Sequence, residues 1–542
     1  MKVSAAIADI LRREGVEVIF GYPRNAVLES AAAIGIRPVI VRQERTGVHM
    51  ADALSRLTRG KHMGVFAMQH GPGTENAYGG VAQAYSESVP VLVLPQGYAR
   101  RIAHVPDNYN ATISMRDITK HAEPITLPGE VGNIMRRAFT LLRNGRLRPV
   151  LVEMPWDILD EEAGDQSDYR PVVRTRSAPD PDAVRVAAQA LVEAQRPVIY
   201  AGQGVHWAEA YAELRELAEL LAAPVSTSLE GKSAFDETHP LALGSGGAAI
   251  PGQLRHFLDR ADLIFGIGCS FAQTTFGVSM PAGKRVIHAT LDPADFNKCV
   301  PCEIALAGDA RLTLSMLVEA CRELLDGPRD AAPVAREIAE VEAQWMAQWL
   351  PLLESEDAPL SPYRVLWELQ KTVDVAETII THDAGSPRDQ LTPFWKSTAP
   401  LSYLGWGKST QLGYGLGLAM GAKLACPDKL CINVWGDAAI GFTGMDFETA
   451  VRERLPILSI LLNNASMAIE LPIMPEATER YRATDISGNY ADFARALGGY
   501  GERVTQPGDI RGAILRGIEA TRNGQPALIE FITAKETRAS RP

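Results

Sequence analysis

The sequence of 542 residues has few cysteines, no long apolar run and no excess of positive charge. Six cysteines are too few for a disulfide framework in so long a chain, and they predict a reducing, cytoplasmic location. No stretch approaches the roughly 20 apolar residues that span a membrane. The first 15 residues carry charges where a signal peptide has its apolar core, so we expect no secretory leader. A formal net charge of −11 argues against nucleic acid or an anionic membrane as a partner.

The rest of the composition is typical of a large globular protein, because 46% of the residues are hydrophobic and 22% are charged. Helical and strand-like patterns alternate from the start of the chain. In its first part, the strand-like segments lie at residues 16–20, 39–41, 64–68, 91–94 and 150–154. Such alternation predicts βαβ units and parallel sheets.

Two polar, proline-bearing stretches divide the sequence into three blocks of similar size. We therefore predict an α/β protein with three open, doubly wound parallel-sheet domains. The expected bounds are 1–165 for the first domain, 183–326 for the central domain and 355–542 for the third.

The segment from 430 to 464 is the most informative part of the sequence. One strand-like run ends in Gly436-Asp437-Ala438-Ala439, and the next ends in Asn463-Asn464. A right-handed crossover brings both strand ends to the same edge of a sheet, so Asp437 and Asn464 are expected to be neighbours. Their carboxylate and amide oxygens suit Mg²⁺. The small residues after Asp437 begin a helix, whose free N–H groups favour a diphosphate.

Gly436-Asp437-Ala438 followed by Asn464 at this spacing resembles the cofactor signature of thiamine-diphosphate enzymes. The third residue of that signature is usually glycine, and the alanine here is a departure that some acetolactate synthases share. The resemblance implies that the metal is held by the side chains of Asp437 and Asn464 and by the carbonyl of Ser466.

Two elements of the first domain also resemble this family. Glu44 follows a strand and begins a helical pattern, as the family's catalytic glutamate does. The resemblance implies that Glu44 donates to N1′ of the aminopyrimidine, which favours the tautomer that removes the C2 proton. A buried glutamate with a raised pKa would serve this purpose. Gly71-Pro72-Gly73 with Asn76 resembles a turn whose glycines let the backbone approach the cofactor.

The third domain carries further positions that the resemblance assigns to the cofactor. Leu412 precedes a glycine-rich run and would prop the cofactor into a bent shape, although core packing is the commoner use of a leucine. The carbonyl of Thr410 would accept from the 4′-amino group. Gly385 and Ser386, after another strand, are expected diphosphate contacts, together with Gly436, Ala438 and Ala439.

The resemblance covers nearly the whole chain and is closest to the catalytic subunits of acetolactate synthase. It implies thiamine-diphosphate- and Mg²⁺-dependent decarboxylation of a 2-oxo acid, with carboligation of the resulting enamine to a second carbonyl. The cofactor would lie between the first domain of one chain and the third domain of another, in a homodimer or homotetramer. The central domain would hold FAD, an ADP-like ligand or nothing.

The chain departs from acetolactate synthase near the expected substrate. Arg24 and Asn25 stand where two glycines are usual, and Arg24 would either bind a substrate carboxylate or lie in a solvated loop. His70 replaces a common serine and is either a proton carrier or a structural histidine. Lys120 and His121 are further substrate-side candidates. Residues 107–112 replace a Phe-Gln-Glu element, so the donor and acceptor substrates stay open.

Other activities fit the same motifs. A 2-oxo acid decarboxylase that does not ligate, or a 2-hydroxyacyl (CoA) lyase, would need the same cofactor residues. A non-catalytic paralogue is a more distant alternative. A copy without activity would have no reason to keep Glu44, Asp437 and Asn464 together.

Overall fold

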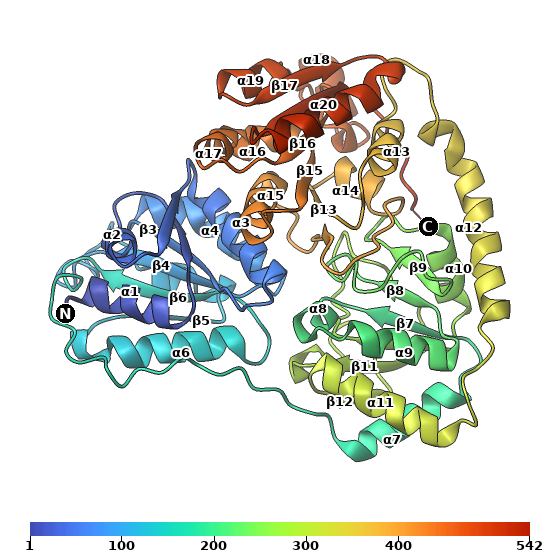
Figure 1. Cartoon of the computed structure of the whole chain (residues 1–542), viewed down its shortest axis with the longest axis horizontal. Helices are drawn as coiled ribbons and strands as arrows, with labels where there is room; N and C mark the ends of the chain where they lie inside the picture. The colour runs from blue at the N-terminus through green and yellow to red at the C-terminus, as the bar shows by residue number, and fades with distance from the viewer. Residues whose placement is uncertain (542) are drawn as a thin grey trace.

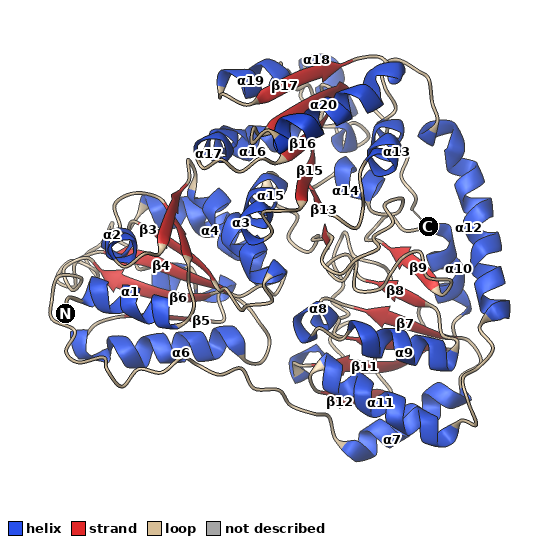
Figure 2. Cartoon of the chain, in the orientation of Figure 1, coloured by secondary structure: helices blue, strands red, loops and turns tan. Residues whose placement is uncertain are grey.

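The computed structural model describes residues 1–541, and this part of the chain forms three six-stranded sheets in which all paired strands are parallel. Each sheet is covered by helices and forms its own lobe (Figures 1 and 2). Strands come from residues 18–155 in the first sheet, 197–307 in the second and 378–532 in the third. The predicted α/β fold with three parallel sheets is therefore confirmed.

The first sheet has the strand order β2-β1-β3-β4-β6-β5. Its strands are β1 (Val18–Gly21), β2 (Arg37–Ile40), β3 (Gly64–Met68), β4 (Val91–Gly97), β5 (His121–Pro124) and β6 (Val150–Pro155). Its helices are α1 (Val3–Arg13), α2 (Ala26–Ala33), α3 (Glu44–Leu57), α4 (Pro72–Ser86), α5 (Ala111–Ser114) and α6 (Val131–Arg143). Strands β3, β4 and β6 are buried along their whole length, which explains their continuous apolar sequences.

The central sheet has the order β12-β11-β10-β7-β8-β9. The first strand, β7, lies in the middle; β8 and β9 follow on one side of it and β10 to β12 on the other, so the strand order reverses between β7 and β10. Its strands are β7 (Pro197–Ala201), β8 (Val225–Thr227), β9 (Ala242–Ser245), β10 (Leu263–Ile267), β11 (Arg285–Thr290) and β12 (Ile304–Ala307). Its helices are α7 (Pro181–Glu193), α8 (Gly204–Ala208), α9 (Tyr211–Leu221), α10 (Gly252–Arg260) and α11 (Ala310–Leu324). This is the order of a dinucleotide-binding fold.

The third sheet has the order β14-β13-β15-β16-β18-β17, which repeats the order of the first sheet when strands are counted along each domain. Its strands are β13 (Thr378–His382), β14 (Tyr403–Leu404), β15 (Leu430–Gly436), β16 (Leu458–Asn463), β17 (Tyr500–Val504) and β18 (Ala527–Ile532). Its helices are α13 (Pro362–Thr372), α14 (Ser386–Leu391), α15 (Tyr414–Ala425), α16 (Asp437–Thr443), α17 (Phe447–Arg452), α18 (Pro475–Tyr481), α19 (Tyr490–Ala496) and α20 (Ile510–Arg522).

Helices α3 and α15 join the first and third domains (Figure 1), and their side chains belong to one hydrophobic core. Two glycines of α15 allow the close approach. A Cβ on Gly417 would lie 2.4 Å from Cβ of His49, and one on Gly421 would lie 2.4 Å from the carbonyl oxygen of Met50. Because these contacts involve backbone and Cβ atoms, the interface excludes larger residues at both positions.

The central and third domains are joined by α12 (Ala332–Leu353) and by the end of the chain. Trp345 and Trp349 of α12 pack against Phe394 of the third domain, with ring centroids 4.8 and 5.2 Å apart. The indole of Trp345 donates to the hydroxyl of Ser540 at 2.9 Å. None of the helices within residues 1–541 is long and apolar enough to cross a membrane.

Candidate active site

The three predicted metal ligands lie together at the carboxyl ends of β15 and β16. Asp437 begins α16, and Asn464 follows β16 directly. The backbone N–H of Ser466 donates to Oδ2 of Asp437 at 3.3 Å and to Oδ1 of Asn464 at 3.0 Å. The single βαβ unit therefore gathers these residues at one point, as the right-handed crossover requires.

The environment of Asp437 suits a bound cation. Asp437 is only 5% exposed, and its carboxylate accepts hydrogen bonds from the backbone N–H groups of Ala438 and Ser466. Burial raises the pKa of Asp437, although these N–H donors oppose the shift. No group of three His, Cys, Asp or Glu side chains within residues 1–541 is placed to hold a metal. A metal here would depend on carboxylate, amide and carbonyl oxygens, the ligands that Mg²⁺ prefers.

Two helix starts lie beside this point, at Gly385 before α14 and at Gly436 before α16. Gly385 has a φ of 83°, which residues other than glycine adopt only under strain. A Cβ on Gly436 would lie 3.8 Å from Pro387 of α14, so the two starts are adjacent. The first turns of these helices, which contain Ser386 in α14 and Ala438 and Ala439 in α16, carry N–H groups without a helical acceptor, and such groups fit a diphosphate; the N–H of Ala438 is the exception, because it donates to Asp437.

Thr410 and Leu412 lie on a loop that leads into α15. Thr410 has a φ of 55°, which is unusual for a β-branched residue, and both side chains are half-buried. Asp383, fully buried after β13, accepts hydrogen bonds from the N–H groups of Gly413 and Gly415 at 2.9 and 3.0 Å. Thr443 of α16 donates to the carbonyl of Gly413 at 2.8 Å. The loop is thus tied to the Asp437 helix.

Glu44 is the first residue of α3 and is only 3% exposed. Burial raises its pKa, and the nearby carboxylate of Asp446 adds to this, while a hydrogen bond with the side chain of Asn76 opposes it. Glu44 and Asn76 line a cavity of about 770 Å³ with residues 440–446 and 488–490 of the third domain. A buried glutamate whose pKa is raised in this way is a candidate acid–base group.

The turn before α4 is held by aromatic residues. Gly71 has a φ of 62°, and a Cβ there would lie 3.0 Å from the hydroxyl of Tyr98. The hydroxyl of Tyr109 donates to the carbonyl of Gly71 at 2.7 Å. Pro72 begins α4, and Gly73 is buried behind it. The segment 107–112, which departs from the acetolactate synthase pattern, therefore supports the predicted cofactor turn.

Within one chain, Glu44 and the metal ligands do not share a cavity. The described residues that line the Glu44 cavity include Ile440 and Thr443 of α16 but not Asp437, Asn464 or Leu412. Tyr490, which lines this cavity, does reach the carbonyl of Asp437 at 3.3 Å.

Arg24, Asn25 and His70, the remaining substrate-side candidates, differ in their surroundings. Arg24 is exposed with a φ of 77°. Burial lowers the pKa of His70, and the positive charge of the nearby Arg24 lowers it further. Asn25 is buried; it caps α2 through Val27 N–H and donates to the carbonyls of Met68 and Leu94. The fold thus uses the whole Asn25 amide, and a substrate contact would have to break these bonds.

Lys120 and His121 lie far along the first sheet from Glu44. His121 begins β5, so it stands at the amino ends of the strands, whereas Glu44 follows the carboxyl end of β2. The Lys120 ammonium donates to the carbonyls of Leu141 and Asn144 at the end of α6, and burial lowers its pKa to about 8. The structure does not bring these two candidates to the Glu44 cavity of the same chain.

The central domain contains a second cavity of about 440 Å³ at the carboxyl ends of its six strands. It lies where the strand order reverses, which is the ligand-binding position of such sheets. Gly204 after β7 and Gly268 after β10 touch there; a Cβ on Gly204 would lie 2.6 Å from Cα of Gly268. Four basic side chains from all three domains line the cavity, namely Arg146, Arg174, Arg255 and Lys408.

Sequence reasoning missed several residues that shape these sites. Asp383, Tyr109, Asp446 and Tyr490 act through contacts between distant segments, which leave no local pattern. A polar residue directly after a predicted strand was a usable signal for Asp383 alone, since it follows β13 as Asp437 follows β15.

Comparisons with known proteins agree with this arrangement. Three family descriptions match: the N-terminal TPP binding domain of thiamine pyrophosphate enzymes over residues 1–120, their central domain over 184–317 and their C-terminal TPP binding domain over 383–531. Thiamine pyrophosphate is another name for thiamine diphosphate. The central-domain match contains the strand ends that line the central cavity, and the C-terminal match contains Asp437, Asn464 and Ser466.

Curated relatives match over nearly the full chain. The acetolactate synthase large subunit of Parasynechococcus marenigrum is 32% identical, over 93% of this chain and 83% of the relative. A probable acetolactate synthase large subunit of Methanocaldococcus jannaschii is 29% identical, over 98% and 92%. The acetolactate synthase isozyme 3 large subunit of Escherichia coli is 28% identical, over 95% and 92%. The chain therefore belongs to the thiamine-pyrophosphate-dependent enzymes and is an acetolactate-synthase-like carboligase or decarboxylase.

Proposed function

We propose that this enzyme releases carbon dioxide from a 2-oxo acid and adds the remaining acyl fragment, as a carbon nucleophile, to the carbonyl group of a second compound. The observation that carries the proposal is the convergence of Asp437, Asn464 and Ser466 at one sheet edge. A buried glutamate with a raised pKa, Glu44, stands at the corresponding edge of another domain. The names of the relatives, acetolactate synthase large subunits, support carboligation as the outcome.

The residues present fit thiamine diphosphate and Mg²⁺. Asp437, Asn464 and the Ser466 carbonyl would hold the metal, and the helix starts at Gly385 and Gly436 would bind the diphosphate. Leu412 would support the thiazolium, and the carbonyl of Thr410 would accept from the aminopyrimidine. When bound, the cofactor supplies a carbon nucleophile that can also accept the electron pair released by decarboxylation.

Glu44 would hold a proton at the pyrimidine nitrogen. Its burial favours the protonated carboxyl group, which can donate to a ring nitrogen that a carboxylate would repel. Asn76 would fix the orientation of the side chain. Arg24 and His70 are our candidates for the substrate carboxylate, because both lie beside the turn at Gly71 and Arg24 carries a permanent charge.

The site would be completed by a second copy of the chain. In support, Glu44 and the metal ligands of one chain do not line a common cavity among the described residues. Phe442 and Met445, at the rim of the Glu44 cavity, are each 47% exposed, which is a large apolar exposure for two neighbouring side chains. A partner's third domain would cover them.

The central cavity would hold a dinucleotide such as FAD. Its place at the reversal of strand order, its close glycines and its four basic residues support a ligand with phosphates. Tyr200, Trp207, Phe271 and Phe276 supply apolar surface for rings. Visible flavin absorbance that copurifies with the protein, and is lost on substitution of Gly204 by valine, would support this assignment.

The test is product analysis on enzyme reconstituted with thiamine diphosphate and Mg²⁺. Pyruvate, longer 2-oxo acids and glyoxylate are supplied singly and in pairs, and carbon dioxide and organic products are followed together. We expect carbon dioxide and a coupled hydroxyketone or 2-hydroxy-3-oxo acid. Carbon dioxide with free aldehyde would make the enzyme a decarboxylase that does not ligate. Bound cofactor with no turnover would overturn the proposal and direct the search to acyl-CoA substrates.

A further inference from the structure

We infer that Glu87 is a positioning residue, which fixes the loop carrying Thr410 and Leu412 and so sets the affinity for thiamine diphosphate. The inference rests on the proposed function, because the roles of Thr410 and Leu412 come from it. Glu87 lies one residue beyond the end of α4 in the first domain, more than 300 positions from the loop in the sequence.

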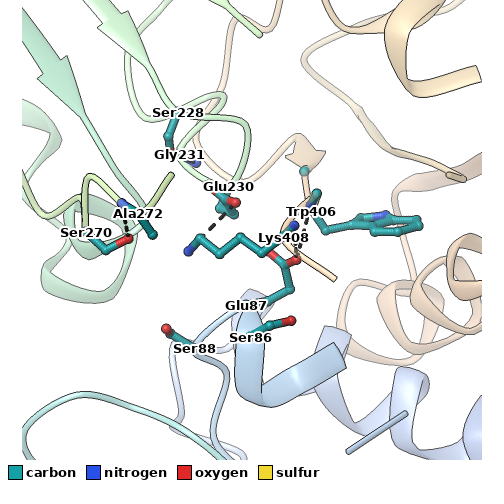
Figure 3. Close-up of polar contacts among 12 residues, drawn as sticks. Ser86, Glu87, Ser88, Ser228, Glu230, Gly231, Ser270, Ala272, Trp406 and Lys408 are labelled. Carbon is teal, nitrogen blue, oxygen red and sulfur yellow. Dashed lines mark hydrogen bonds and ion pairs between the residues drawn. The ribbon is translucent and has the colours of Figure 1, made fainter. Parts of the chain in front are cut away.

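Glu87 is fully buried and aimed at the loop backbone (Figure 3). Its Oε1 accepts hydrogen bonds from the N–H groups of Gly407 at 3.1 Å and Lys408 at 2.8 Å. The same oxygen accepts from the amide nitrogen of Gln83, one helical turn earlier, at 2.9 Å. The side-chain oxygen of Gln83 in turn accepts from the backbone N–H of Gln411 at 3.0 Å. One carboxylate therefore holds the loop directly at two positions and through Gln83 at a third.

The third position lies between the two predicted cofactor contacts, Thr410 and Leu412. Helix α4 comes so close that a Cβ on Gly79 would lie 2.0 Å from the side-chain nitrogen of Gln411. Thr410 has a φ of 55°, a conformation that a β-branched residue keeps only when its surroundings impose it. Without these hydrogen bonds the loop would relax, and the carbonyl of Thr410 would change direction.

The reason for a carboxylate at this position lies at the junction of the three domains (Figure 3). Lys408 reaches from the loop toward Glu230 of the central domain, with Nζ 3.8 Å from its carboxylate, and both residues line the central cavity. Arg56 of α3 donates to the carbonyl of Gly405 at 2.8 Å. Glu87 thus lies beside two cations, Lys408 and Arg56, at a loop whose own backbone N–H groups need an acceptor.

The experiment measures thiamine diphosphate binding by calorimetry, with excess Mg²⁺, on the full-length enzyme and on four variants. We expect Glu87→Ala to raise the dissociation constant about 10-fold or more, a factor that corresponds to the loss of a few hydrogen bonds. At saturating cofactor, kcat should stay within about 3-fold of wild type, since Glu87 touches no reacting atom. Glu87→Gln keeps an acceptor oxygen and should restore most of the affinity.

Glu323→Gln is the control for net charge, because Glu323 is exposed on α11. Gln83→Ala removes the acceptor for Gln411 and the amide that donates to Glu87, but keeps the two direct bonds of Glu87 to the loop, and it decides the question if Glu87→Ala does not fold. Wild-type affinity in Glu87→Ala, or in Gln83→Ala if that variant must replace it, would overturn the inference. A lowered kcat with unchanged cofactor affinity would overturn it as well. A wild-type enzyme that binds no thiamine diphosphate would instead overturn the proposed function.

Discussion

The buried carboxylate of Asp383 accepts a hydrogen bond of 2.9 Å from the backbone N–H of Gly413, the residue that follows Leu412. Its other oxygen accepts from Gly415 at 3.0 Å, and its first oxygen also accepts from Ala384. Burial raises the pKa of Asp383 to about 7, although the three donors oppose this. A side chain at the end of β13 thus fixes the start of α15, and with it the loop on which the proposed cofactor contacts lie.

We expect Asp383→Ala to lower the free energy of unfolding by about 2 kcal/mol or more. The substitution leaves three N–H groups, of Ala384, Gly413 and Gly415, without an acceptor, and each buried N–H group that loses its acceptor costs about 1–3 kcal/mol. Urea denaturation measures the effect, and Asp428→Ala, at an exposed position in the same domain, is the control. Equal stability of the two variants would show that Asp383 does not hold the loop.

Glu44→Gln is expected to lower kcat by about 100-fold or more, because proton transfer by a placed carboxyl group contributes about 10²–10⁴-fold. Thiamine diphosphate binding should persist, since the metal and diphosphate contacts lie on the third domain. Deuterium exchange at C2 of the bound cofactor measures the step directly. Glu29→Gln, at an exposed site on α2, should behave as wild type. A Glu44→Gln enzyme with normal exchange would contradict the assigned role.

Asn464→Ala should raise the Mg²⁺ concentration needed for half-maximal cofactor binding by about 10-fold, as expected for loss of one hard-oxygen ligand. Its side chain is half-buried and its oxygen bonds only to the N–H of Ser466 among residues 1–541, so the fold should tolerate the change. Wild-type enzyme should gain thermal stability from thiamine diphosphate with Mg²⁺, and the variant should gain less. Identical Mg²⁺ curves would remove Asn464 from the metal site.

Mixing two nearly inactive variants tests whether the site lies between chains. Glu44→Gln and Asp437→Asn should each retain only about a hundredth of wild-type activity or less when alone. If each site combines Glu44 of one chain with Asp437 of another, a mixed dimer has one intact site, and random mixing should restore roughly a quarter of wild-type activity. If both residues serve the same chain's site, no mixture recovers activity. Unfolding and refolding the two variants together, with each refolded alone for comparison, provides the measurement.

Stability should depend on pH through Glu87. Burial and the neighbouring Glu230 raise the Glu87 pKa to about 7, against opposing effects of Lys408 and Arg56. Between pH 4.5 and about 7 the folded chain therefore holds a proton that the unfolded chain releases. The contribution of this proton to the free energy of unfolding is complete below pH 4.5 and is lost as the pH rises toward about 7. The urea midpoint of Glu87→Gln, which does not titrate, should fall less than that of wild type over this interval. Parallel curves would show that the site carries no raised pKa.

The sequence was sufficient to predict the pairing of Asp437 with Asn464, because both follow strands of a single βαβ unit whose handedness is fixed. It was insufficient for Asn25. Its amide bonds to the carbonyls of Met68 and Leu94, 43 and 69 positions later, and only the assembled sheet reveals that. Lys120 and His121 were expected near the substrate, but the direction of β5 places them at the other edge of the sheet from Glu44.

The repeated strand order of the first and third domains was also beyond sequence analysis. The two sheets share the order 2-1-3-4-6-5 without a visible repeat in the sequence, because an order of strands is specified by apolar patterning and chain reversals rather than by particular residues. The central sheet differs in order, and its cavity could be placed only once its reversal point was known.

The contact of α3 with α15 at Gly417 and Gly421 packs the first and third domains so closely that we expect them to move together as one unit. Glu44 stands at the start of one of these helices and Leu412 just before the start of the other, so neither can shift without carrying its counterpart along. If cofactor binding closes the enzyme, the closing movement must occur between such units, or between a unit and the central domain, and not inside one. If each active site lies between two chains, one such movement would shift Glu44 of a chain toward one active site and Leu412 of the same chain toward another.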